Sequence, residues 1–192
     1  TVIPADPLTT INTTVFAVSN DNRLWANSGW AWIAVPGAES TKYVTVAHDG
    51  TIWRLDGNGK PFAWGGAGWT EFPTSNGFKA IGTAGNRKVW AVGVDGAFYK
   101  FDGKQFMKVD PKPTALRVNT SNVFDPVALE NLSVSLDGNV YASGRVPSGQ
   151  VAVLKWDFQG ERFSTVFYGA STSTAISATG KLYMISAQGQ MA

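Results

Sequence analysis

The stretch VAHDGTIW, Val46 to Trp53, places one Asp-Gly pair between two short apolar runs. An Asp-Gly pair flanked by alternating apolar residues predicts a tight β-hairpin, because glycine accepts the positive φ that such turns require. Related versions return along the chain: VSNDNRLW from Val18, VGVDGAFY from Val92, VSLDGNVY from Val134 and ISATGKLY from Ile176. One hairpin cannot bury its own apolar face, so we expect the copies to pack on one another.

The copies share more than their turns. Each has a β-branched residue three positions before the turn residue and an aromatic residue four positions after it; the aromatics are Trp25, Trp53, Tyr99, Tyr141 and Tyr183. These aromatics lie 28 to 46 residues apart, a period typical of propeller blades and solenoid coils. A ring of blades is favoured over a solenoid, because the terminal repeats of a solenoid need a polar outer face, whereas a closed ring has no exposed terminal repeat.

Further strands fit between the hairpins, such as PFAWG and WTEFP after Trp53, which gives four strands per repeat. We therefore predict an all-β protein, a five-bladed β-propeller with four-stranded antiparallel blades, forming a single domain over residues 1–192. The segment TVIPADP resembles the segments that close other repeats. We expect Thr1 to Pro4 to supply the outer strand of the last blade and so to close the ring.

Composition sets limits on the class of protein. Of 192 residues, 44% are hydrophobic and 16% are charged, which is enough for a packed core. There is no cysteine and one histidine, so we expect no disulfide, no metal site and no cofactor. No apolar run approaches the roughly 20 residues of a membrane-spanning helix. We expect a soluble chain, in the cytoplasm or secreted, since a start at Thr1 is compatible with a removed leader.

The run IGTAGNRKVWAVGVDGAFYKFDGKQFMKV, Ile81 to Val109, resembles a tectonin repeat. The second repeat, with its Gly-rich turns and GAGWTEFP, is similar to the five-bladed tachylectin-2 type. Both are β-propeller lectins, so the resemblance implies a carbohydrate-binding protein. The Trp that opens the last strand of a tectonin repeat matches Trp32 and Trp69, whereas Phe106 and Phe163 stand there in later repeats. Two or three working sites would follow.

Tryptophans outside the repeated positions are the candidate ligand contacts. An indole stacks on the apolar face of a sugar ring while its N–H bonds a hydroxyl, although packing between blades explains such residues equally well. Trp64 and Trp69 flank a Gly-Gly-Ala-Gly turn, and Arg54 or His48 from the neighbouring hairpin could bond sugar hydroxyls. The predicted ligand-binding residues are Trp64, Trp69, Arg54, His48, Trp30, Trp32 and Trp156.

Other functions stay open as alternatives. A propeller face serves equally well as a platform for protein–protein interaction. A glycosidase-like enzyme is the third hypothesis, but no carboxylate is placed near the expected ring axis, so we predict no enzyme and no catalytic residue. The expected partners are glycans or glycoconjugates, and a homo-oligomer is compatible with the sequence.

Basic residues concentrate between Lys79 and Arg117. This excess could favour anionic glycans, in which case binding through Lys100, Lys104, Lys108 and Lys112 should weaken as salt rises. Because these residues are not interleaved with base-stacking aromatics in a known module, we expect no nucleic-acid binding.

Overall fold

The structure, a computed structural model, describes residues 15–27, 29–85, 88–109, 127–159, 162–170, 173–177, 179 and 181–185. These residues form 17 strands and contain no helix, in agreement with the predicted all-β class. Consequently no described segment offers a helix long and apolar enough to cross a bilayer. Thr1 to Pro4, expected to close the ring, lie outside the described residues.

The strands form five antiparallel sheets, numbered here in chain order. The first contains β1 (Val15–Val18), β2 (Leu24–Asn27) and β3 (Trp32–Ala34). The second contains β4 (Thr41–Val46), β5 (Ile52–Asp56), β6 (Pro61–Trp64) and β7 (Trp69–Glu71), and the third contains β8 (Phe78–Thr83), β9 (Val89–Gly93), β10 (Phe98–Phe101) and β11 (Phe106–Val109). The fourth contains β12 (Ala128–Val134), β13 (Val140–Arg145), β14 (Val151–Asp157) and β15 (Arg162–Gly169), and the fifth contains β16 (Ser173–Ile176) and β17 (Leu182–Ile185).

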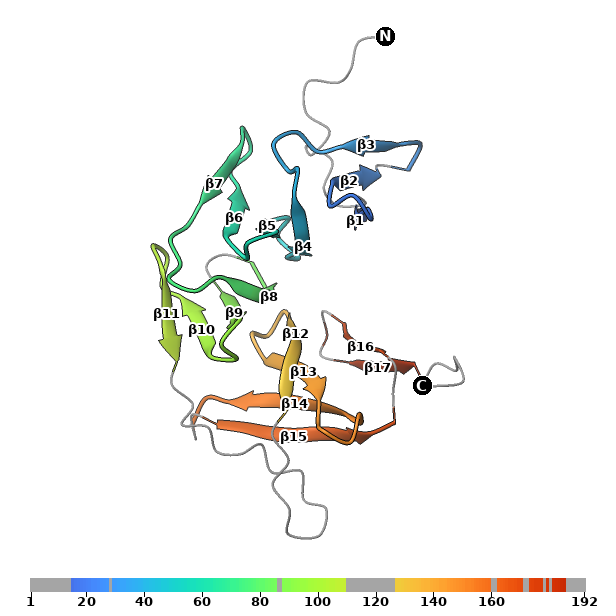
Figure 1. Cartoon of the computed structure of the whole chain (residues 1–192), viewed down its shortest axis with the longest axis vertical. Coiled ribbons are helices and arrows are strands. Elements are labelled where there is room, and N and C mark those ends of the chain that lie inside the picture. Colours follow the sequence, from blue (N-terminus) through green and yellow to red (C-terminus); the bar gives the residue numbers. More distant parts are fainter. Residues whose placement is uncertain are drawn as a thin grey trace.

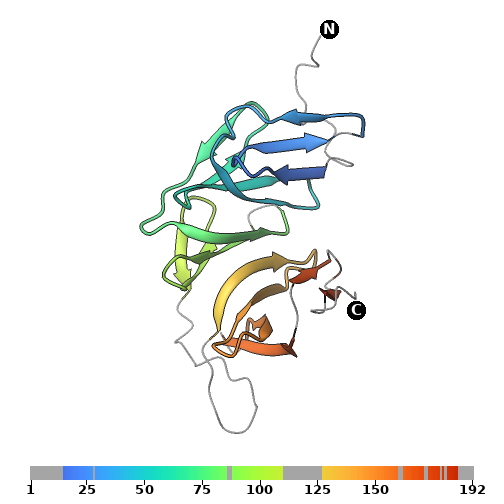
Figure 2. The same cartoon turned by 45° about the vertical axis from the view of Figure 1, so that its right-hand side comes forward.

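Within each sheet the strands pair in sequence order, so every sheet is a meander. Consecutive sheets follow one another around an arc, with the first and the fifth at its two ends (Figure 1). Figure 2 shows the same succession from a second direction. The first strands of the second, third and fourth sheets line the inside of this arc, which is the arrangement of a β-propeller.

The repeated hairpins do not all hold the same position in their sheets. The turns at Asp49 and Asp137 join the first and second strands of a sheet, whereas the turn at Asp95 joins the second and third. Both kinds of turn have the same chemistry: the Asp carboxylate accepts from the backbone N–H two residues on, at 3.0 Å for Asp49 and 2.9 Å for Asp95. A positive φ at Gly50 and Gly96 completes both turns. The repeated hairpin was expected at the same place in every blade. In the third sheet it is shifted by one strand relative to the second and fourth sheets.

The first sheet begins at the position of a second strand. β1 lies beside β4 of the next sheet in the same way that β5 lies beside β8 and β9 beside β12. The turn at Asp21 therefore corresponds to the turn at Asp95. Within the described residues, the first sheet thus holds strands equivalent to the second, third and fourth of a blade, and the fifth sheet holds strands equivalent to the first and second.

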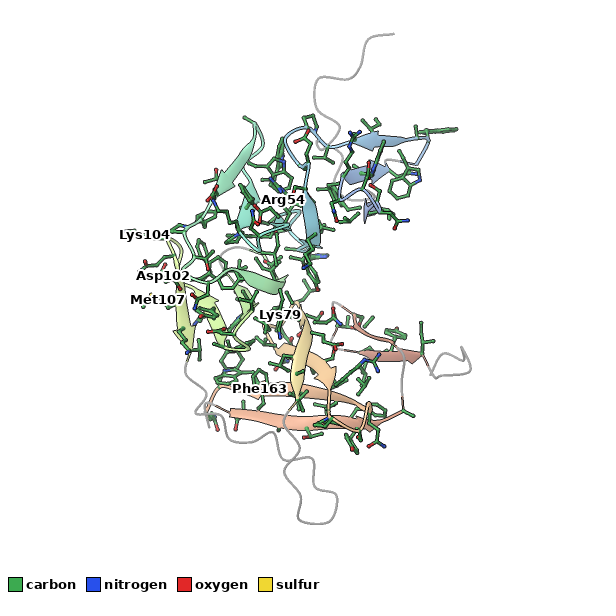
Figure 3. The ribbon with its side chains drawn as sticks, viewed as in Figure 1. Arg54, Lys79, Asp102, Lys104, Met107 and Phe163 are labelled. Carbon is green, nitrogen blue, oxygen red and sulfur yellow. The ribbon has the colours of Figure 1, made fainter. Side chains whose placement is uncertain are left out.

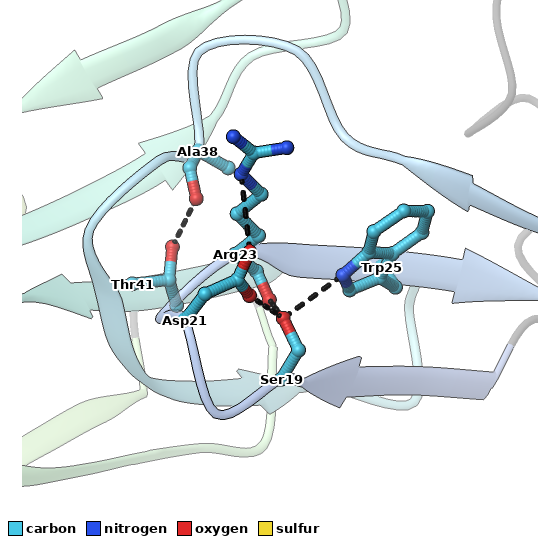
Figure 4. A network of polar contacts seen from close by, with 6 residues as sticks. All are labelled: Ser19, Asp21, Arg23, Trp25, Ala38 and Thr41. Carbon is cyan, nitrogen blue, oxygen red and sulfur yellow. Dashed lines mark hydrogen bonds and ion pairs between the residues drawn. The ribbon is translucent and has the colours of Figure 1, made fainter.

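Side chains fix the first turn (Figure 4). The Ser19 hydroxyl donates to the Asp21 carboxylate and accepts from Trp25 Nε1 at 3.0 Å. Arg23 Nε lies 3.4 Å from Asp21 Oδ2. The strand that follows the turn is in this way tied to the strand before it.

Apolar clusters fill the spaces between the first four sheets. The first and second sheets bury Leu24, Ala26, Val35, Ala38 and Ile52. The second and third bury Trp53, Leu55, Phe78, Ile81, Val89, Ala91, Tyr99 and Phe101. The third and fourth bury the largest cluster, which includes Trp90, Val92, Phe98, Leu132, Val140, Leu154 and Trp156. The second and third sheets thus each pack one face on the preceding sheet and the other on the following sheet.

Candidate functional site

The face that the fourth sheet turns toward the fifth is unlike the faces between the other sheets. Its neighbouring side chains on β12 and β13 are Asn131 paired with Ser143 and Ser133 paired with Tyr141. At the position of Asn131 and Ser143, the second sheet has Tyr43 with Leu55 and the third has Ala80 with Val92. At the position of Ser133 and Tyr141, these sheets have Thr45 with Trp53 and Gly82 with Trp90. An amide and a hydroxyl therefore stand where apolar side chains form the core elsewhere.

A cavity of about 270 Å³ lies against this face. Three sheets contribute to it, because β4 and β16 approach β12 on the inside of the arc. The lining residues are Tyr43, Thr45, Asn131, Leu132, Ser133, Tyr141, Ala142, Ser143, Val153 and Ala175. We call this space the inter-sheet cavity. Its volume is just below the usual lower limit for small-molecule sites, which suits one compact ligand.

The lining is polar but uncharged. No Asp, Glu, His, Lys or Arg side chain is among the described residues that line the cavity. Burial raises the pKa of Tyr43, whose hydroxyl also interacts with the backbone of Leu132. Tyr43 therefore stays protonated at neutral pH and keeps a hydroxyl that can donate and accept. Such a cavity can bind a neutral polar molecule without taking a charge out of water.

A second, smaller cavity of about 130 Å³ adjoins the first and shares Thr45 and Ser133 with it. It lies where the first strands of the second, third and fourth sheets end. Its other lining residues are Val46, His48, Thr83, Ala84, Val134 and Leu136. We call it the mouth cavity. His48 was expected to support Trp64 and Trp69, but neither Trp is among the residues that line this cavity with it.

Trp64 and Trp69 lie together, as the sequence predicted, with ring centroids 5.3 Å apart. Both are half-buried and pack against the cluster between the first and second sheets. The indole N–H of Trp69 donates to the carbonyl oxygen of Pro36 at 3.1 Å. These contacts tie the second sheet to the loop before β4, which is the packing alternative considered for these residues.

Arg54 is a structural residue in this position. Its side chain is 4% exposed and lies within the second sheet (Figure 3). The guanidinium donates to the carbonyl oxygen of Gly37 at 3.0 Å and lies 4.1 Å from the centroid of the Phe62 ring and 5.0 Å from that of Trp69. Burial lowers its pKa, an effect that Asp56 and Glu39 oppose. The prediction that Arg54 reaches sugar hydroxyls is corrected here, because the group is already enclosed.

The predicted position of Trp156 is also corrected. It was expected near a rim, but it is 3% exposed and lies in the core between the third and fourth sheets. Its ring centroid is 5.6 Å from that of Phe98 and 5.0 Å from that of Phe163. Figure 3 shows Phe163 on the side of the fourth sheet that faces the third. The indole is thus mostly enclosed by the core, and it also contributes to the lining of a cavity of about 390 Å³ beside Lys155 and Phe158.

Trp30 and Trp32 are the exposed members of the predicted set, at 98% and 49%. Trp32 opens β3, at the position that Trp69 and Phe106 hold in the next two sheets. Trp69 and Phe106 pack on the preceding sheet. Trp32 is exposed because no described residues cover that face of the first sheet.

The predicted basic surface lies on the third sheet. Lys100, Lys104 and Lys108 are exposed, and Lys104 stands with Asp102 and Met107 at the outer edge of the sheet (Figure 3). Lys100 also lies over the Trp90 ring, 5.5 Å from its centroid. Lys112 lies outside the described residues. The structure does not bring these lysines to either cavity.

Comparison with known proteins adds information on the fold. No protein-family model matches the chain, and no curated protein matches it in sequence. Solved structures do: YCF48 from Cyanidioschyzon merolae has a TM-score of 0.55 at 16% identity over 90% of this chain, and U3-55K has 0.58 at 13% identity over 92%. A protein provisionally assigned as a 6-phosphogluconolactonase, from Bacteroides fragilis, has 0.52 at 14% identity over 94%.

These likenesses establish the β-propeller fold and no more, because identities this low do not carry function. They do not support membership of the tectonin or tachylectin-2 lectins. The chain spans 60%, 58% and 62% of the length of the three matched structures.

Proposed function

We propose that the chain is a propeller that binds small carbohydrates without altering them, through the inter-sheet cavity. The lining of this cavity is the observation that supports the proposal. Amide and hydroxyl groups stand on a face that in the second and third sheets joins the next sheet by apolar packing, and Tyr43 and Tyr141 also line the cavity. The lectin function is the one that the sequence suggested, assigned to a site that the sequence analysis did not identify.

The chemistry of the lining suits a sugar ring. A sugar presents hydroxyl groups around its edge and a face of C–H groups, so it requires both hydrogen-bonding groups and aromatic surface. Tyr43 and Tyr141 supply rings from two different sheets. Asn131 supplies an amide that both donates and accepts, and Thr45 supplies a hydroxyl.

Binding without catalysis follows from the same lining. Glycoside hydrolysis ordinarily uses two carboxyl groups about 5 to 10 Å apart. The described residues around the cavity supply no carboxyl group. A neutral site also predicts an affinity that changes little as salt rises, in contrast to binding through the lysines of the third sheet.

The test is a glycan-array screen followed by titration of the best saccharide against the wild type and Asn131→Ala. Asn131 is exposed on β12, so its truncation should leave the fold intact. Loss of its hydrogen bonds should weaken binding by about 3- to 10-fold. The matched control is Glu130→Ala, the adjacent exposed residue on the same strand, which is not part of the lining and should bind as the wild type does.

Two results would contradict the proposal. One is a screen in which no saccharide binds. The other is a saccharide whose affinity is the same for the wild type and Asn131→Ala, which would place the site elsewhere. Thermal unfolding of both variants verifies that any loss of binding is not a loss of fold.

Protein–protein interaction is the second candidate function. Val15 and Trp32 pair with Asn27 from its two sides, so they share the open face of the first sheet, and both are exposed. Trp30, two residues before Trp32 in the chain, is also exposed. Exposed apolar groups gathered on one face favour a protein contact. Under this alternative, Trp30→Ala and Trp32→Ala would abolish partner binding, whereas under the carbohydrate proposal they leave saccharide affinity unchanged.

We also propose that the five sheets correspond to five blades of one ring, as the sequence suggested. The two open faces at the ends of the arc support this proposal. The open face of the fifth sheet corresponds to the face by which other sheets pack on the following sheet. The open face of the first sheet corresponds to the face by which other sheets pack on the preceding sheet. The two ends of the arc are therefore matched in kind.

A further inference from the structure

The inter-sheet cavity does not stand alone, because Thr45 and Ser133 line both it and the mouth cavity. A ligand seated in the larger cavity therefore has the smaller one as its continuation. The mouth cavity, at about 130 Å³, is too small to serve as a site of its own. It lies at the C-terminal ends of β4, β8 and β12, which are the first strands of the second, third and fourth sheets.

The rim of the mouth cavity has a composition that differs from the larger cavity. His48 is exposed there, and so are two apolar side chains, Val46 at 38% and Leu136 at 42%. An imidazole can donate to one hydroxyl and accept from another, while exposed apolar side chains cover C–H groups. The three residues come from two different sheets and converge on the same cavity.

We infer that the site binds the end of an oligosaccharide: one sugar unit occupies the inter-sheet cavity and the next extends into the mouth cavity against His48 and Leu136. This inference rests on the proposed function and narrows it, since a monosaccharide would leave the mouth cavity unused. His48 and Leu136 occupy the same position in their turns, directly before the Asp. His48 sets the preference for a longer saccharide.

The experiment compares a monosaccharide with the matching di- and trisaccharide by calorimetry, using the best binder from the array screen. The wild type should bind the disaccharide more tightly than the monosaccharide. His48→Ala should weaken disaccharide binding by about 3- to 10-fold, equivalent to one hydrogen bond, and leave monosaccharide binding unchanged. Leu136→Ala should act in the same direction.

The matched control is Val94→Ala. Val94 is an exposed apolar residue at the turn between β9 and β10, and it lines neither cavity. It should bind both saccharides as the wild type does. Thermal unfolding of each variant confirms that the fold is retained.

The outcomes separate the two proposals. If the monosaccharide and the disaccharide bind equally well, or if His48→Ala weakens both to the same extent, the inference about length is wrong and the carbohydrate site stands. If Asn131→Ala binds every saccharide as the wild type does, or if none binds at all, both are overturned.

Discussion

At the scale of single residues, two positions decide whether the space between neighbouring sheets becomes core or cavity. Where Tyr43 and Leu55 pair in the second sheet, Asn131 and Ser143 pair in the fourth. Ser143 is buried and Asn131 is exposed on the same face. Burying polar side chains such as these requires hydrogen-bond partners, so they do not close a dry interface as apolar side chains do. An alignment on the turns places Asn131 with Tyr43 and Ser143 with Leu55, but it leaves the third repeat one strand out of register. The general rule that this face is apolar is therefore not visible from the aligned turns alone.

The tryptophans show a second limit of sequence patterns at this scale. Outer-strand tryptophans were predicted to stack on a ligand, and the structure shows that Trp64, Trp69 and Trp156 pack between sheets. Ligand binding by Trp64 and Trp69 stays a prediction. Sequence distinguishes the two roles poorly, since both need a large aromatic side chain near a turn. Only the position of the neighbouring sheet separates Trp69, which is covered, from Trp32, which is not.

Arg54 gives a prediction for stability. Arg54→Ala removes the bond to the Gly37 carbonyl and the contacts with Phe62 and Trp69, and it leaves a cavity within the second sheet. We expect the free energy of unfolding to fall by about 2 to 4 kcal/mol. Urea unfolding measures this change.

Arg54→Lys is the control for charge. It keeps a cation at the position but lacks the planar group that lies over the two rings, so it should recover only part of the loss. Wild-type stability in Arg54→Ala would show that the enclosed guanidinium contributes nothing to the packing of the first two sheets.

At the scale of elements, the hairpin is the unit that the sequence predicts well. Alternating apolar residues and Asp-Gly turns identified strands on both sides of Asp49, Asp95 and Asp137, and the structure confirms them. The place of each hairpin within its sheet could not be predicted in the same way. The same Asp-Gly turn joins the first and second strands in the second sheet and the second and third strands in the third sheet, so only contacts between sheets distinguish the two positions.

The turn carboxylates predict a dependence of stability on pH. The Ser19 hydroxyl lowers the pKa of Asp21, the backbone N–H groups of Gln105 and Lys104 lower that of Asp102, and the Ser135 hydroxyl lowers that of Asp137. A pKa that is lower in the folded state favours folding above the unfolded-state value, 3.8 for Asp, and this contribution is lost as pH falls through the folded-state values. Stability should therefore be retained at about pH 6 and decline below about pH 4.

Urea unfolding at a series of pH values tests this dependence, with Asp102→Asn as the comparison. The amide cannot be deprotonated, so this variant should be less stable than the wild type near neutrality, and the difference should narrow in acid. A constant difference between the two proteins at every pH would contradict the assignment of the effect to ionisation of Asp102.

At the scale of the whole molecule, the fold followed from the sequence to the level of an all-β propeller, and the ring of five blades is a proposal. The chain has no cysteine, so cysteines can be introduced in pairs. Tyr183 and Trp32 are the chosen positions, since Trp53 and Phe106, their equivalents between the second and third sheets, have ring centroids 5.9 Å apart.

If the ring closes in solution, Tyr183→Cys combined with Trp32→Cys should be joined within one chain by a short bismaleimide. Mass spectrometry of the digested monomer detects the linked peptides. Each single cysteine variant is a control for non-specific reaction. A double variant that yields no intramolecular link would count against the closed ring of five blades.

The unlike faces at the two ends of the arc also bear on how the protein behaves at high concentration. Contact between such faces on separate molecules is head-to-tail, so each addition leaves a free face at either end and growth need not stop at a dimer. Closure within one chain competes with this growth and is favoured by dilution. Trp32, Tyr183 and Ile185, exposed on these faces, would then be the residues at which linear polymers nucleate.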